Sequence, residues 1–305
     1  MRVAMLNMYT SNIYSMQNTL STMAHLEQQM ASSKALLRPS DDPIGTVKVL
    51  TSERHLAATE QYIKNIDSLS SSLERSETYL SGMVDLQNRM REISLLASNG
   101  SASAEDRAAY ASELTELLES MVDSVNAKDE AGNYLFSGNK TNTAAVAKDA
   151  SGQYVYQGDN NHREVQTSAN AWTEANVTAG EFLFANGSTD LLNQTQALID
   201  ALNDPAMSPG NSGFDNVISQ MMTTLDDTLD SCNSAITDIG GKQNSLQLAK
   251  GAHEEMALFN EEVIGETEAL DYPSAVSEFQ MRLTALQVSQ QSFVKISKLS
   301  LFNHL

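Results

Sequence analysis

The two ends of the chain carry apolar residues at helical spacing and not one acidic side chain. All 39 acidic residues of the 305-residue chain lie between Glu27 and Glu278. Near the N-terminus, the apolar residues recur every three or four positions, which places them along one side of a helix. This stripe consists of Leu6, Tyr9, Ile13, Met16, Leu20 and Met23. An amphipathic helix is therefore predicted at the N-terminus.

A similar stripe near the C-terminus predicts a second amphipathic helix. The faces opposite both stripes carry Ser, Thr, Asn and Gln, where a solvated helix usually carries Lys and Glu. Neutral polar side chains suit a crowded protein environment, so both helices are predicted to contact partners on several sides. The alternative is that the two helices simply pair within one chain. The predicted assembly residues are Leu6, Ile13, Met16, Leu20, Met23, Phe279, Leu283, Leu286, Phe293, Ile296, Leu299 and Phe302.

Charge and composition exclude several classes of function. The net charge of -20 would repel phosphate backbones, so nucleic acid is not expected as a partner. Neither a secretory signal peptide nor an apolar run of about 18 residues is found, so no membrane span is expected. A cytoplasmic protein and one exported without a cleaved signal both remain possible. A single cysteine, Cys232, excludes a disulfide within the chain.

Helix signals continue inside the two ends. The segment from Ser40 to Pro43 is a strong helix start, in which Asp42 is the predicted cap and Pro43 the first helical residue. The helical period then continues as far as Asn99-Gly100. Ser103 and Asp106 have the spacing of a capping box for a second helix. The two predicted helices form a hairpin.

From about residue 133 to 187, short runs rich in aromatic and β-branched residues replace the helical period. Strands are predicted at 134–136, 154–156, 164–167 and 182–184, with turn residues between them. A short helix at 191–202 and a long helix from Phe214 should follow, the latter bent or interrupted at Gly240-Gly241. The insert is expected to face outward and to contribute little to axial assembly.

The predicted fold is mainly α: an elongated helical bundle or coiled coil formed by the N- and C-terminal segments, with a small inserted β-rich domain. Three parts are expected. Residues 1–40 and 270–305 would be terminal assembly helices forming an inner core, 41–130 and 190–269 the helical body, and 131–189 the β-rich outer domain.

Motifs for catalysis are nearly absent. The five histidines have no ligand-like spacing, and no phosphate loop, dinucleotide fingerprint or nucleophile elbow is present. Ser292 and Lys295 match an SxxK pattern without its companion motifs, and they lie within the tail helix. We therefore predict no catalytic, cofactor-binding or metal-binding residue, and a protein that is not an enzyme.

Four segments resemble the bacterial flagellar axial protein family, and within it the hook-associated protein 3 branch. They are RPSDDP at 38–43, NAKDEAGNYLFSG at 126–138, YQGD at 156–159 with REVQ at 163–166, and ALD at 269–271 with the tail to residue 305. Flagellin, the nearest competitor, usually has a segment close to AKDDAAGLA where this chain has PSDDPIGT. Tyr272-Pro273 departs from the family pattern, in which a small residue is more usual, and the proline suggests that the terminal helix begins there.

The resemblance implies a structural subunit that joins the hook, through hook-associated protein 1, to the flagellin filament. It implies a ring-like homo-oligomer outside the cell, secretion by the flagellar type III apparatus, an export chaperone that covers the C-terminal helix, and no cofactor. The alternatives are a flagellin-type filament subunit and a soluble helical adaptor that grips partner helices.

Overall fold

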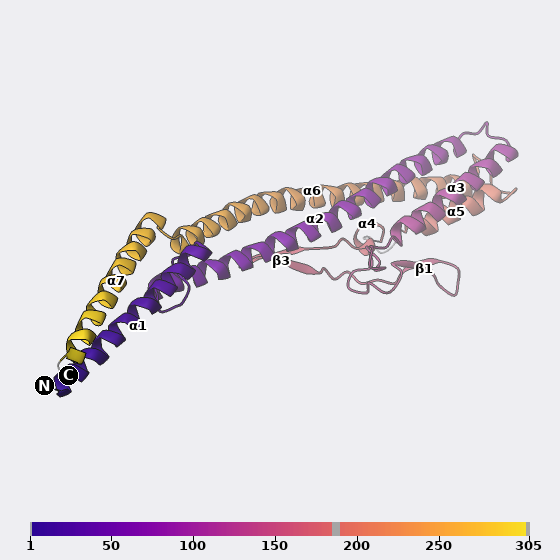
Figure 1. Ribbon diagram of the computed structural model, residues 1–305. Coiled ribbons are helices and arrows are strands. Elements are labelled where there is room, and N and C mark those ends of the chain that lie inside the picture. Colours follow the sequence, from indigo (N-terminus) through magenta and orange to yellow (C-terminus); the bar gives the residue numbers. More distant parts are fainter. Residues whose placement is uncertain (1, 185–189, 303–305) are drawn as a thin grey trace. The chain divides into compact units, whose positions relative to one another are not determined.

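The computed structural model describes the backbone of residues 2–184 and 190–302, and the side chains of residues 7–184 and 190–295 (Figure 1). Its helices are α1 (Arg2–Ser32), α2 (Pro43–Ala97), α3 (Ala104–Val125), α4 (Ala179–Phe182), α5 (Leu191–Asn203), α6 (Ser212–Glu268) and α7 (Tyr272–Phe302). Its strands are β1 (Val146–Lys148), β2 (Tyr154–Tyr156), β3 (Glu164–Ser168) and β4 (Ala171–Glu174). The predicted class, mainly α with a small β-rich insert, is confirmed.

Local signals account for several helix boundaries. α2 begins at Pro43 and α7 just before Pro273, as predicted. At the start of α3, the Ser103 hydroxyl accepts a hydrogen bond from the Asp106 N–H at 3.1 Å, and the Asp106 carboxylate accepts one from the Ser103 N–H at 3.0 Å. This reciprocal pair is the predicted capping box.

Of the two alternatives predicted at Gly240-Gly241, a bend or an interruption of the long helix, the interruption is wrong. α6 is helical from Ser212 to Glu268, through both glycines. A glycine inside a helix costs about 1 kcal/mol relative to alanine, which tertiary packing outweighs. Here Ile239 is fully buried immediately before the pair and Leu246 is buried one and a half turns after it.

The strands form two antiparallel pairs, β1 with β2 and β3 with β4. The predicted strands at 154–156 and 164–167 are confirmed, whereas those at 134–136 and 182–184 are wrong. Tyr134 makes one isolated bridge, to Lys128, and Phe182 is the last residue of α4. Phe136 and Phe182 pack edge to face, with ring centroids 5.3 Å apart, and both are almost completely buried. Their aromatic character serves core packing rather than strand pairing.

The chain divides into two compact units. The terminal unit comprises Met1–Thr59 and Glu255–Leu305, and the central unit comprises Glu60–Glu254. A single large core cluster occupies the central unit, and all of its residues lie between Ile66 and Leu246. This cluster includes Phe136 and Phe182 of the insert beside Leu73 of α2 and Leu114 of α3. The insert therefore shares one core with the helices of the central unit, in which α3 and α5 lie side by side (Figure 1).

Candidate assembly surface on the terminal helices

The terminal unit is built around α1 and α7, which lie side by side (Figure 1). Near the chain ends, the rings of Tyr9 and Phe293 stack in a tilted arrangement with centroids 4.7 Å apart. Further along the pair, Met23 is 8% exposed and Leu286 is 7% exposed. The two helices thus pair within one chain, which was the predicted alternative to contacts with partners.

This pairing covers only part of the two stripes. Met23 and Leu286 are buried, whereas Ile13 and Leu20 remain 36% and 50% exposed. The half-buried members are Met16, Phe279, Leu283 and Phe293. Leu6, Ile296, Leu299 and Phe302 lie outside the residues whose side chains the structure describes. Contact between α1 and α7 therefore leaves apolar surface uncovered.

Further exposed apolar side chains lie outside the predicted stripes. On α1, Tyr14 is 76% exposed, and on α7, Met281 is 67% exposed. Other such residues of the terminal unit are Met8, Ile44, Val47, Leu50, Met256, Leu258, Phe259, Val288 and Val294. A helical stripe includes the residues of one face only, so apolar residues on the other faces are left out of it. Those additional apolar residues are the sequence signal that could have identified this surface.

The terminal and central units therefore differ in how they treat apolar residues. Most of the described large apolar side chains that are exposed belong to the terminal unit, and most of those that are buried belong to the central unit. A monomeric soluble protein seldom exposes a wide apolar patch, and larger patches mark contacts with other proteins. The exposed apolar side chains of the terminal unit are therefore the candidate contact surface.

The segment between α1 and α2 is organised by two neighbouring carboxylates. Asp42 Oδ1 accepts a hydrogen bond from the Ile44 N–H at 3.0 Å, which is the geometry of a helix N-cap with Pro43 as the first helical residue. Asp41 Oδ2 accepts hydrogen bonds from the N–H groups of Leu37 and Arg38, at 3.2 and 2.9 Å. The SDDP motif thus uses one carboxylate for the helix and the other for the preceding turn, a division that the sequence reading missed.

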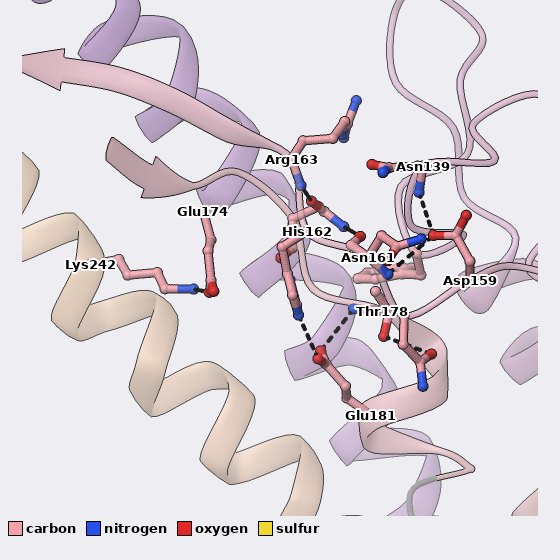
Figure 2. A network of polar contacts seen from close by, with 12 residues as sticks. Asn139, Asp159, Asn161, His162, Arg163, Glu174, Thr178, Glu181 and Lys242 are labelled. Atoms are coloured by element: carbon pink, nitrogen blue, oxygen red, sulfur yellow. Dashed lines mark hydrogen bonds and ion pairs between the residues drawn. The ribbon is translucent and has the colours of Figure 1, made fainter. Parts of the chain in front are cut away.

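The insert holds a polar network between the β3–β4 hairpin and α4 (Figure 2). The ring nitrogens of His162 face two acceptors, the Asn176 carbonyl at 3.1 Å and a Glu181 carboxylate oxygen at 2.7 Å. Partial burial lowers the pKa of His162, but the Asn176 carbonyl and the carboxylates of Glu181 and Glu174 outweigh it and raise the pKa above its usual value. Lys242 of α6 pairs with Glu174 at 2.7 Å. The ion pair between Lys242 and Glu174 links the insert to α6.

Neither the single thiol nor the acidic and histidine side chains form a reactive or metal-binding site among the described residues. Cys232 of α6 is fully buried, and burial raises the pKa of its thiol to about 11, although a hydrogen bond from Gln87 opposes this shift. Such a thiol is unreactive at neutral pH. Among the described residues, no three His, Cys, Asp or Glu side chains gather as metal ligands would. Over the same part of the chain, no helix has the length and apolarity needed to cross a membrane.

Comparison with known proteins finds similarity to flagellar proteins. Residues 3–141 match the family described as bacterial flagellin N-terminal helical region. A solved structure described as a flagellar hook-associated protein, from Vibrio parahaemolyticus, is 38% identical, with a TM-score of 0.70, and the match covers 75% of this chain and 100% of that one. Proteins named flagellar hook-associated protein 3 match over 99% of both chains, at 25% identity in Escherichia coli and 24% in Salmonella typhimurium.

The chain belongs to the flagellar hook-associated protein 3 family. It is a structural component of the bacterial flagellum. The alternative of a flagellin-type filament subunit is not favoured, because the hook-associated proteins match over the full length.

Proposed function

We propose that this protein joins the hook, through hook-associated protein 1, to the flagellin filament. The observation that carries the proposal is the uncovered apolar surface of the terminal unit, on which Leu20, Tyr14 and Met281 are at least half exposed. Burying a large apolar side chain contributes about 1.5 to 3 kcal/mol, so several such residues can hold a stable contact between subunits. The relatives' name, hook-associated protein 3, is consistent with a position next to the hook.

The parts of the chain have different proposed roles. Residues 1–40 and 270–305 form the inner assembly helices of a ring-like homo-oligomer. Residues 41–130 and 190–269 form the helical body, and residues 131–189 form the outer domain. Exposed apolar residues on several faces of α1 and α7 support contacts with more than one kind of neighbour, namely other copies, hook-associated protein 1 and flagellin.

The same surface supports a proposal about export. A chain with so much exposed apolar surface risks aggregation before assembly. We propose that a flagellar export chaperone covers the C-terminal helix, that the type III apparatus secretes the chain, and that it acts outside the cell. The role is structural rather than enzymatic, and nucleic acid has no part in it.

Deleting the gene tests the junction role. Cells without the protein should secrete flagellin that stays unassembled, and normal filaments on those cells would refute the proposal. A complementation pair then locates the surface. Leu20→Ser, in the terminal unit, should reduce the number of filaments per cell. Leu248→Ser is the matched control, because Leu248 is 70% exposed but belongs to the central unit. Equal loss with both variants would argue against the terminal unit as the assembly surface.

A further inference from the structure

Tyr272, the residue that departs from the family pattern, makes two hydrogen bonds at the start of α7. Its hydroxyl oxygen lies 2.7 Å from the Met30 carbonyl oxygen and 2.8 Å from the Ser33 Oγ. The Met30 carbonyl is one of the last four of α1, which have no partner inside the helix. A side chain of α7 thus caps the C-terminal end of α1.

The chemistry of the three groups determines which one donates. A carbonyl oxygen only accepts, so the single hydroxyl proton of Tyr272 goes to Met30. The tyrosine oxygen is then the acceptor in the second contact, and the Ser33 hydroxyl is its donor. Both hydrogen bonds depend on one atom, so removing that atom removes both together.

Ser33 is held in a conformation that it would not adopt readily by itself. Its φ is 60°, in the left-handed region that a residue with a side chain seldom occupies. Such a residue persists where surrounding contacts hold it. Here the contacts come from across the terminal unit: Tyr272 bonds the Ser33 hydroxyl, and the Leu270 N–H donates to the Ser33 carbonyl at 3.3 Å.

The residues that follow α1 continue this contact with those that precede α7. The Ala35 N–H donates to the Glu268 carbonyl at 2.7 Å, and Lys34 forms an antiparallel bridge with Ala269. The Lys34 ammonium also pairs with the Glu268 carboxylate at 2.6 Å. The two connecting segments therefore form a short antiparallel ladder, and Tyr272 closes it at the end nearest the terminal helices.

We propose that Tyr272 is a clasp that joins the end of α1 to the start of α7, so that the two helices enter the assembly as one preset pair. The contacts of the clasp exist within a single chain. Only the statement that the paired helices enter an assembly rests on the proposed function. Sharing one hydroxyl between an orphan carbonyl and the strained Ser33 links the register of α7 to the end of α1. This explains why a tyrosine occupies a position where a small residue is more usual.

Hydrogen exchange on the dilute full-length protein tests the clasp. Tyr272→Phe removes only the hydroxyl, and it should lower the protection of the Leu270 and Ala35 amides about fivefold to tenfold, as expected for the loss of one or two hydrogen bonds. Tyr14→Phe is the matched control, because Tyr14 is an exposed tyrosine on α1, and protection should stay unchanged. Equal protection in the wild type and Tyr272→Phe would overturn the proposal.

A double-mutant cycle with Ser33→Ala checks the shared atom. Because Ser33 and Tyr272 use the same contact, protection should fall less in the double variant than the two single losses combined. Strictly additive losses would show that the two hydroxyls act independently, and the clasp would be refuted. Both measurements use unassembled protein, so a failure of the junction role in the gene-deletion experiment leaves their outcome unaffected.

Discussion

Removing residues 279–305 should abolish junction formation while leaving the central unit folded. The large core cluster lies between Ile66 and Leu246, so the truncation removes none of its side chains. Among the described residues of the deleted segment, Leu286 is the apolar one that is buried, at 7% exposure, and it belongs to the terminal unit. Its loss costs about 1.5 to 3 kcal/mol, and that cost falls on the pairing of α1 with α7.

A substitution inside the core gives the shift in Tm against which the effect of the truncation is compared. Leu73 is completely buried in the central unit, and Leu73→Ala should cost about 2 to 5 kcal/mol. For a unit of roughly 200 residues, this lowers the Tm by about 5 to 15 °C. The truncated protein should instead keep the main transition within about 2 °C of the wild type, since its core is intact.

Scanning calorimetry on the full-length protein, the truncated protein and Leu73→Ala measures these shifts. Electron microscopy of complemented cells then reports junction formation. If truncation lowers the main transition as far as Leu73→Ala does, the tail belongs to the core of the central unit and the prediction is wrong. Filaments supported by truncated subunits would also contradict it, because the tail would then not be needed for assembly.

Other perturbations probe the cap, the polar network and the insert. Asp42→Ala should lower the unfolding free energy by about 1 kcal/mol, measured by chemical denaturation, whereas Asp42→Asn keeps the accepting oxygen and should cost less. Because the folded-state pKa of His162 is raised, its stabilising contribution is complete below the ordinary value of about 6.5 and is lost as pH rises through the folded-state pKa. The fall in Tm with rising pH should therefore be smaller in His162→Gln than in the wild type. Identical profiles of Tm against pH would show that the protonated His162 does not stabilise the fold. Replacing residues 133–187 by a Gly/Ser linker removes Phe136 and its neighbours from the shared core, and should lower the Tm more than one core substitution does. Trp172→Ala changes an exposed residue of the same insert and should leave junction formation intact, which filament counts would check.

Features decided within a few residues could be predicted from the sequence. The Ser103–Asp106 capping box and the helix start at Pro43 depend on side chains three positions apart or fewer, and the structure places both as expected. The terminal helices follow from a period that one helix carries by itself. The β2 and β3 strands also lie where the alternation of residues indicated.

Features that depend on contacts between distant segments could not be predicted from the sequence. Leu20 and Met23 belong to one stripe, yet Leu20 is half exposed and Met23 is buried, because burial depends on which neighbour lies opposite. Phe182 was read as part of a strand, but its burial against Phe136 determines its role. Asp41 is a local exception: its carboxylate accepts hydrogen bonds from Leu37 and Arg38, four and three residues away, yet it was assigned only to a helix start because the sequence does not show which of two adjacent carboxylates serves the turn.

The sequence by itself determined the helical character of this protein, the position of its insert and the absence of acidic residues from its ends, because periodicity, capping and composition are local properties. The tertiary structure decided which apolar residues are buried and which remain for partners. It also decided that Tyr272 meets Met30 and Ser33, about 240 residues away in the chain. No local pattern records such a contact, because it depends on the distance that folding sets between two remote segments.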